Sequence, residues 1–368
     1  IFIRILLIPI FIKYWILIDV KRINYLSLMI LVSVVFVCID TIYQFTNYDP
    51  IKGFGRDIFG FIPDFYGRLT GPFKGELIPG AFVSKFSLLG LIFLFNFKKN
   101  KYQKIFIILY LSLVGIVCYI SGERMSLATF ILAILILIFF LKEWRFITLI
   151  SLLIIIISCF TINKLHPFYN DFEIIESSPF HLGLKVEKEF NCSNSLDKKC
   201  KKILNLQPEF IKVLQKFKYS AYGQIYKLGL KMWFDHPFQG IGLNNYYYLC
   251  KNDSRYKNSI KKYISENEFE ITDCVSHPHN IYLQWLVEAG IFGLIFFILY
   301  QFALFFIVFK NGVNNYSVIS FANLTVLFWP IMSTGSLLKN WNGVSTFVII
   351  GICISLSTLH YSKEKKTN

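Results

Sequence analysis

Two histidines and an asparagine stand together directly before a strongly apolar stretch. Their order is Ser276-His277-Pro278-His279-Asn280, and a hydrophobic run of membrane-spanning length follows. An imidazole titrates near neutral pH and can take a proton from a hydroxyl nucleophile, so the stretch predicts a general base at a membrane surface. The alternative, which the stretch taken alone favours, is that both histidines are interfacial polar residues that anchor a helix end.

Cations lie beside two other apolar stretches. Arg124 falls in the very short connection 121–126, and Arg68 and Lys74 fall in a glycine-containing loop. A guanidinium presents planar, permanently charged donors that match phosphate oxygens, so these residues predict the binding of a lipid-linked phosphate. The alternatives are a snorkelling Arg124, paired with Glu123, and an ordinary solvated loop around Arg68.

Membrane helices are the elements that must position these residues. The chain is 55% hydrophobic and 17% charged, whereas about a quarter of the residues of a soluble globular protein are charged. Roughly twenty apolar residues cross about 30 Å of hydrocarbon as a helix, and several runs reach that length. The sequence therefore predicts an all-α, polytopic transmembrane helical bundle with spans near 2–18, 23–43, 78–97, 105–121, 125–141, 147–163, 281–309, 316–335 and 343–361.

The net charge of +15 indicates membrane topology and does not predict a nucleic-acid partner. Lysine and arginine are concentrated in alternate short connections, and an excess of these residues marks the cytoplasmic side. The visible start of the chain is therefore expected outside the cytoplasm and the C-terminus inside it. Because Ile1 already lies in an apolar run, we also expect that an N-terminal segment is missing, together with further membrane helices.

Two outer segments are long enough to carry chemistry. One is the loop 44–77. The other, 164–276, is expected to form a mainly helical domain, because 208–234 has apolar residues at helical spacing. The expected domains are then N-terminal membrane helices at 1–163, the outer domain at 164–276, and C-terminal membrane helices with a cytoplasmic tail at 277–368.

The outer domain holds four cysteines, Cys192, Cys200, Cys250 and Cys274. In an oxidising compartment they can form two disulfides in one of three connectivities. The local pairing of Cys192 with Cys200 and of Cys250 with Cys274 is favoured. The alternative is four free or metal-binding thiols, although the CxxC spacing typical of a zinc site is absent.

Four segments together resemble the O-antigen ligases and O-antigen polymerases. The stretch 277–294 resembles the His-Asn segment that closes the large periplasmic loop of that family. The stretch 234–245 resembles the loop's other hallmark, an Asp-His-Pro followed by Gly-x-Gly and an asparagine, and 121–126 and 68–82 resemble its Ser-Arg turn and its upstream arginine loop. The residues of the second hallmark are Asp235, His236, Pro237, Gly240, Gly242 and Asn245.

This resemblance implies a GT-C-like membrane glycosyltransferase of the bacterial inner (cytoplasmic) membrane, with its large loop in the periplasm. Such enzymes take a glycan from undecaprenyl pyrophosphate and pass it to an acceptor hydroxyl. The acceptor is lipid A-core in a ligase and a lipid-linked glycan in a polymerase, and the sequence does not separate these two. The resemblance also implies membrane lipids as surroundings, an inverting reaction, and no cofactor or metal.

The resemblance gives the candidate residues their roles. His279 is expected to orient or deprotonate the acceptor hydroxyl, with Asn280 and His277 holding its imidazole, and Arg124, Arg68 and Lys74 are expected to bind the pyrophosphate. One departure concerns an arginine and a tryptophan that family members often place upstream of the Asp-His-Pro. Those positions hold Tyr222 and Tyr226, so the replacement is Lys218, Lys227 or Lys231, or else Arg68 and Arg124 act alone.

Two other classes of function compete with this one. A transporter, such as a flippase for lipid-linked glycans or an exporter subunit, would also have many spans with charges inside them. A large outer domain ending in paired histidines suits a transporter less well. A membrane-anchored scaffold without activity is the third possibility.

Overall fold

The computed structural model describes residues 2–19, 21–49, 53–63, 67–97, 101–170, 173–177, 184–191, 199–206, 214–263, 269–331 and 335–367. The chain is mainly helical with little sheet, which confirms the predicted fold class. Two compact units make up the chain. One consists of 1–170, 303–329 and 344–368, and the other of 171–302 and 330–343.

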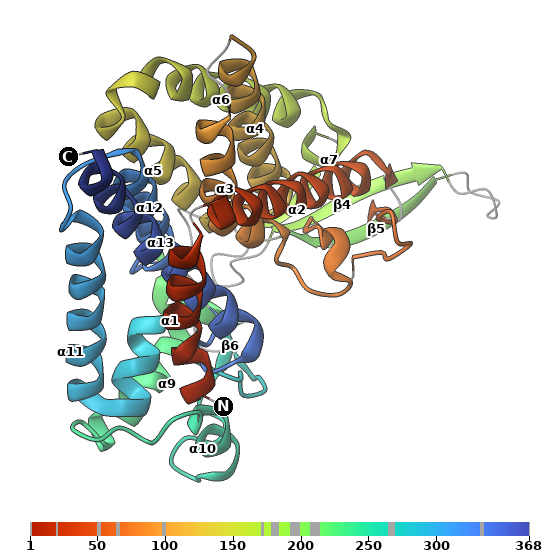
Figure 1. The fold of residues 1–368 in the computed structure, drawn as a ribbon. Helices are drawn as coiled ribbons and strands as arrows, with labels where there is room; N and C mark the ends of the chain where they lie inside the picture. Colours follow the sequence, from red (N-terminus) through yellow and green to blue (C-terminus); the bar gives the residue numbers. More distant parts are fainter. Residues whose placement is uncertain are drawn as a thin grey trace. The chain divides into compact units, whose positions relative to one another are not determined.

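The first unit is a bundle of apolar helices (Figure 1). Within it, α2 packs on α3, α3 on α4, and α4 on α6. A Cβ at Gly90 would lie 2.6 Å from the Tyr110 hydroxyl and 3.0 Å from the Leu31 Cα, so α2 and α3 meet through a small residue, as membrane helices commonly do. The helices are α1 (Phe2–Ile18), α2 (Lys21–Thr46), α3 (Pro79–Asn96), α4 (Lys101–Ile120), α5 (Arg124–Phe140), α6 (Arg145–Leu165), α7 (Pro167–Asn170) and α12 (Asn315–Leu327), with most of α13 (Asn340–Thr367).

Short elements join these helices. Strands β1 (Tyr48–Asp49) and β2 (Gly53–Phe54) pair antiparallel in the loop after α2. Two 3-10 turns, η1 (Gly71–Phe73) and η2 (Lys142–Trp144), precede α3 and α6.

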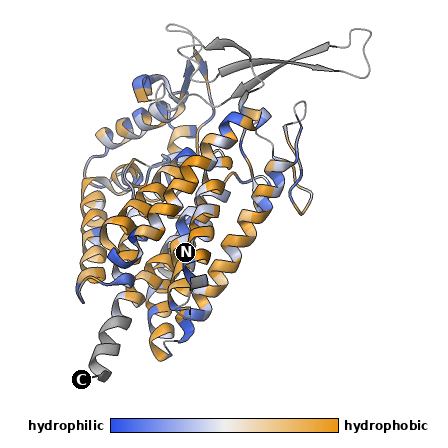
Figure 2. Cartoon of the chain, turned by 90° about the horizontal axis from the view of Figure 1, so that it is seen from above, coloured by the Kyte–Doolittle hydropathy of each residue, from blue (hydrophilic) through white to orange (hydrophobic). Residues whose placement is uncertain are grey.

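The apolar helices make the chain a multi-pass membrane protein. Within the described residues, six helices are long and apolar enough to cross a membrane, and Leu6–Ile18 and Arg124–Phe140 are shorter apolar helices. Figure 2 shows hydrophobic residues along most of the length of these helices. Each predicted span coincides with a helix, but the span predicted at 316–335 ends at Leu327. The helix stops there because Pro330 follows, and the residues before a proline are disfavoured in the α conformation.

The second unit combines a small sheet with helices α9 (Ala221–Asp235), α10 (Tyr246–Asn252) and most of α11 (Ile281–Phe309). Its core consists mainly of α9, α10 and α11 side chains, and Leu228, Met232 and Val287 are buried in it. Cys250 and Cys274 join in a disulfide at this core, which is the local pairing that the sequence favoured. Cys192 lies outside the described residues, so its pairing with Cys200 stays a prediction.

The strands of the second unit are an addition that the helical periodicity did not predict. The antiparallel strands β3 (Glu173–Ser177), β4 (Leu184–Asn191) and β5 (Lys199–Leu206) form a three-stranded sheet in the order β3-β4-β5. A second pair, β6 (Lys261–Tyr263) and β7 (Phe269–Ile271), is joined antiparallel, and a 3-10 turn η3 (Phe217–Tyr219) precedes α9.

Candidate functional site

His279 is the centre of an aromatic cluster in the second unit. Its ring lies 4.2 Å from the ring of His277 and 5.9 Å from that of Tyr222 on α9, measured between centroids. Burial lowers the pKa of His279, and the positive charge of Lys339 lowers it further. The imidazole is therefore neutral at physiological pH, and a neutral imidazole can accept a proton.

The backbone of His279 is unusual. It lies in the left-handed region, with a φ of 55°, which few non-glycine residues adopt. The residue that follows fixes this turn, because the Asn280 side-chain oxygen accepts hydrogen bonds of 3.0 Å from the backbone N–H groups of Tyr282 and Leu283. Asn280 thus caps α11, and its amide nitrogen also donates to the Pro330 carbonyl at 2.8 Å. We conclude that Asn280 orients the segment that carries His279.

Tyr222 and Tyr226 contact this same segment. Tyr222 packs edge-on against His279, while the Tyr226 hydroxyl shares a hydrogen bond with the side chain of Asn280. Burial raises the pKa of Tyr226, so its hydroxyl stays protonated. The two tyrosines at the departure from the family pattern therefore line the histidine cluster. Of the three candidate replacements, Lys231 donates to the Arg255 carbonyl at 2.6 Å, and Lys218 lies over the ring of Tyr219.

The Asp-His-Pro segment ends α9 and returns to α11. The Tyr256 hydroxyl donates to the Asp235 carboxylate, and the His236 backbone N–H donates to the Trp233 carbonyl at 2.9 Å, which closes the last turn of α9. The Pro237 carbonyl then accepts from the Trp233 indole at 3.1 Å and from the Ile291 backbone N–H at 2.9 Å. The hydrogen bonds of this segment thus join the end of α9 to the loop that follows α10 and to α11.

The Gly-x-Gly turn lies against a break in α11. Gly290 has a φ of 68° and a ψ of −168°, so α11 is kinked there. A Cβ at Gly240 would come within 2.6 Å of the Ala289 nitrogen, and one at Gly290 within 2.1 Å of the Phe238 carbonyl oxygen. The Ile241 and Gly242 N–H groups donate to the carbonyls of Val287 and Glu288, both at 2.9 Å. Only glycine allows this approach of two backbones.

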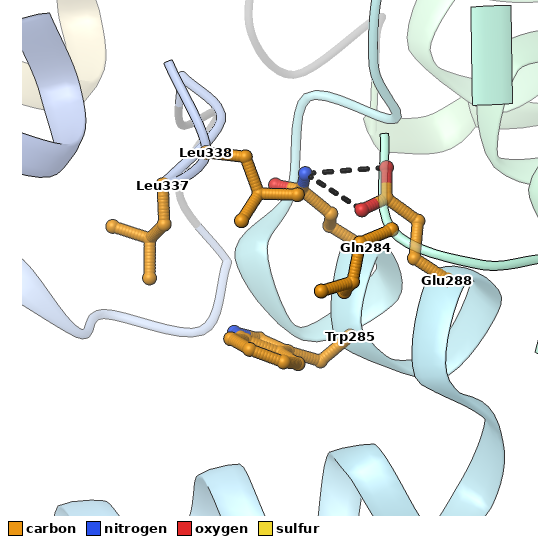
Figure 3. A pocket seen from close by; sticks show the side chains of 6 residues that line it. Gln284, Trp285, Glu288, Leu337 and Leu338 are labelled. Atoms are coloured by element: carbon orange, nitrogen blue, oxygen red, sulfur yellow. Dashed lines mark hydrogen bonds between the residues drawn. The ribbon is translucent and has the colours of Figure 1, made fainter. Parts of the chain in front are cut away.

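A buried carboxylate completes the contact between the turn and α11. Glu288 is 2% exposed and accepts hydrogen bonds from the Asn244 backbone N–H at 3.0 Å and from the Gln284 amide at 3.3 Å. The same amide donates to the Ser336 hydroxyl at 2.7 Å, while Asn245 donates to the Ile241 carbonyl at 3.0 Å. Figure 3 shows Gln284 and Glu288 at one side of a small pocket that is lined by Leu243, Gln284, Trp285, Glu288, Leu337 and Leu338.

The phosphate-binding candidates belong to the first unit. The Leu69 N–H donates to the Ser121 carbonyl at 3.2 Å, and a Cβ at Gly122 would come within 2.6 Å of the Gly67 carbonyl oxygen. The structure thus brings the Arg68 loop onto the 121–126 turn, where Arg124 is the exposed first residue of α5. A terminal guanidinium nitrogen of Arg68 donates to the Leu77 carbonyl at 3.2 Å, and the Nε of Arg68 is buried.

Glu123 directly precedes Arg124 in the same turn and was not among the predicted site residues. Its carboxylate accepts from the Ala81 N–H and the Ser126 hydroxyl, both at 2.9 Å, so it joins the turn to the start of α3. Burial raises the pKa of Glu123, whereas the charges of Arg68 and Lys85 lower it. The sequence signal was available, since Glu123 stands beside Arg124, but the approach of Arg68 needs the fold.

Lys74 is placed differently from the two arginines. It is exposed, has a φ of 60°, and its ammonium lies 5.6 Å from the centre of the Phe61 ring. The loop before it is fixed by Gln44, whose side-chain oxygen accepts from the N–H groups of Thr70 and Gly71, both at 2.9 Å. Lys74 is therefore a solvent-facing cation on a well-anchored loop.

No group of three or more histidine, cysteine, aspartate or glutamate side chains suited to a metal ion occurs in the part of the chain that the structure describes. The candidate residues thus form two clusters, with His277, His279 and Asn280 in the second unit and Arg68 and Arg124 in the first. The contacts of Tyr222 and Lys339 with the histidine segment, and of Gln284 with Ser336, join residues far apart in sequence, and no local pattern predicted them.

One comparison with known proteins identifies a relationship. The family model described as O-antigen ligase matches residues 107–298, which is just over half of the chain. The matched region includes Arg124, the Asp235–Asn245 segment and His277 to Asn280, and it begins after Arg68 and Lys74. A search of curated proteins found no match.

Proposed function

The chain belongs to the O-antigen ligase family, and from this premise we propose that it transfers a glycan from undecaprenyl pyrophosphate to an acceptor hydroxyl. Membership of the family means a role in the assembly of O-antigen or a related surface polysaccharide. The donor, the acceptor and the site residues are our proposal. The observation that carries it is a half-buried His279, whose pKa is lowered by burial, at the start of a membrane helix and fixed by the Asn280 cap.

In the proposed reaction His279 acts as the general base. The acceptor oxygen forms a bond to the anomeric carbon while its proton passes to a ring nitrogen of His279. The bond from the anomeric carbon to the pyrophosphate oxygen breaks, and its electron pair leaves with undecaprenyl pyrophosphate. Direct displacement of this kind inverts the anomeric configuration. A depressed pKa weakens His279 as a base but keeps it unprotonated, and the acceptor hydroxyl loses its proton only as the new bond forms.

The cations of the first unit are assigned to binding of the leaving group. We assign Arg68 and Arg124 to the pyrophosphate, whose charge increases as it leaves, and Lys74 to its solvent side. Two features support this assignment: the exposed position of Arg124 at the start of α5, and the contact of the Arg68 loop with the same turn. Glu123 offsets part of the charge of Arg68, which favours an arginine that is held in place before the donor binds.

Orientation in the membrane follows from the charges of the connections. We place the histidine segment and the second unit's loop in the periplasm and the C-terminus in the cytoplasm of an inner-membrane protein. This placement is supported by the lysines and arginines of the alternate connections. It also agrees with a lipid-linked donor, because that class of donor replaces nucleotide sugars outside the cytoplasm.

The test uses the full-length protein in proteoliposomes with an undecaprenyl-pyrophosphate glycan, with and without lipid A-core. Glycan that is attached to lipid A-core, and only when that acceptor is present, identifies a ligase. A ladder of longer lipid-linked chains without lipid A-core identifies a polymerase. Movement of the glycan across the membrane without any new glycosidic bond would replace the proposal by a transporter.

A further inference from the structure

Lys339 follows a turn that is fixed by the buried Ser336. The Ser336 hydroxyl, which is 1% exposed, accepts hydrogen bonds from the Gln284 amide at 2.7 Å and from the Leu338 N–H at 3.1 Å. The Lys339 N–H donates to the Ser336 carbonyl at 3.2 Å. The backbone that carries Lys339 is therefore anchored to α11 at Gln284, which lies four residues after the Asn280 cap.

The ammonium of Lys339 reaches the histidine segment through one serine. It donates to the Ser276 hydroxyl oxygen at 2.8 Å, and that oxygen lies 2.9 Å from Nδ1 of His277. An ammonium is only a donor, so Ser276 must accept from it. His277 in turn packs on His279 with 4.2 Å between the ring centres. The ammonium of Lys339 is thus held beside two imidazoles whose rings pack at an angle of 42°.

This geometry disfavours a second positive charge. A like charge nearby opposes protonation, and burial opposes it too. The titratable and charged groups around His279 include His277 on its own segment, Tyr222 and Tyr226 on α9, and Lys339 on the segment before α13. Burial and Lys339 both lower the pKa of His279, in agreement with the positions of these groups.

We propose that Lys339, held by Ser276, is a positioning residue that keeps His279 in the neutral form able to accept a proton. This inference rests on the proposed function only in assuming that His279 accepts a proton during catalysis. The effect of Lys339 on the imidazole is a property of the structure that can be measured without any turnover. Lys339 itself needs no contact with the donor or the acceptor in this role.

The first test measures the protonation of His279 directly. Diethyl pyrocarbonate modifies neutral imidazoles, so the rate of modification of His279, followed by mass spectrometry across a pH series, reports its titration in the full-length protein. In Lys339→Gln the midpoint is expected at higher pH than in the wild type, and in Lys339→Arg close to the wild type. Ser276→Ala should move it in the same direction as Lys339→Gln, because the ammonium loses its anchor. Lys257→Gln, which removes an exposed lysine from the same unit, is the control and should change nothing.

The second test measures glycan transfer over the same pH range. Lys339→Gln is expected to lose activity mainly on the acid side and to recover as the pH rises, because His279 then loses its proton at a higher pH. An unchanged midpoint in Lys339→Gln, or an activity loss of equal size at every pH, would overturn the inference. A third outcome is that Lys339→Gln shifts the midpoint of His279 while the wild-type protein transfers no glycan. That outcome would reject the proposed function and leave the effect of Lys339 on His279 intact.

Discussion

At the scale of single residues, His279 has an uncommon backbone conformation and is also the proposed general base. A non-glycine residue in the left-handed region costs about 1 to 3 kcal/mol, and such residues persist only where their surroundings hold them. Here the Asn280 cap follows directly, and Pro278 and His277, whose ring packs against that of His279, precede it. The imidazole is therefore directed by the backbone and by its neighbours together. A substitution that tests the role of the imidazole must therefore tolerate the left-handed backbone conformation.

Glu123 allows a test of the cation cluster at the same scale. Glu123→Ala leaves the Ala81 N–H and the Ser126 hydroxyl without their acceptor, and an unsatisfied buried group costs about 1 to 3 kcal/mol. Because burial raises the pKa of Glu123, its contribution to stability is complete below the pKa of the unfolded state and decreases as the pH rises. The neutral Glu123→Gln, which keeps an acceptor oxygen, should be at least as stable as the wild type near pH 7.

Thermal unfolding in detergent micelles measures both variants. Glu76→Gln and Glu76→Ala, at an exposed position of the same loop region, serve as matched controls and should unfold like the wild type. Equal losses in Glu123→Gln and Glu123→Ala would show that the charge of Glu123, and not its hydrogen bonds, holds the turn to α3.

At the scale of elements, the break of α11 at Gly290 explains the glycines of two motifs. Gly240→Ala and Gly290→Ala each add a Cβ within 2.6 Å of backbone atoms and also strain a positive φ. Gly312→Ala strains a φ of 90° but has open space around the new Cβ. We expect Gly312→Ala to cost about 1 kcal/mol and the other two to cost about 1 to 3 kcal/mol more. Unfolding temperatures that are equal for all three variants would contradict this account of the kink.

The elements also show what the sequence could and could not predict. Apolar length predicted a helix for every span, because twenty hydrophobic residues have few alternatives in a membrane. The kink at Gly290 was missed, since 281–309 has the length and hydrophobicity of one continuous span and the break depends on the close approach of the turn at Gly240. The His279 segment was proposed from its residue types, from its place before an apolar run and from the resemblance to the family. Its contacts with Tyr222 and Lys339 depend on tertiary structure, and so does the approach of Arg68 to Glu123.

At the scale of the whole molecule, the proposed orientation has a direct test. In intact cells, a membrane-impermeant maleimide should label Lys257→Cys, which lies in the second unit's loop, and should not label Lys142→Cys in a connection rich in cations. Both lysines are exposed, so accessibility within the protein is matched. The unsubstituted protein controls for the native cysteines, of which Cys38, Cys118, Cys159 and Cys353 are free thiols in the described part of the chain. Labelling of Lys142→Cys alone would reverse the orientation and place the histidine segment in the cytoplasm.

The central claim is that this membrane protein forms a glycosidic bond with His279 as its base. The variant of choice is His279→Asn, because asparagine tolerates the left-handed conformation while removing the imidazole. The most direct measurement compares its rate of glycan transfer from undecaprenyl pyrophosphate with that of the wild type in matched proteoliposomes. We predict a loss of about 100-fold to 10,000-fold at equal amounts of folded protein, the range expected for a general base. Transfer by His279→Asn at the wild-type rate would contradict the claim.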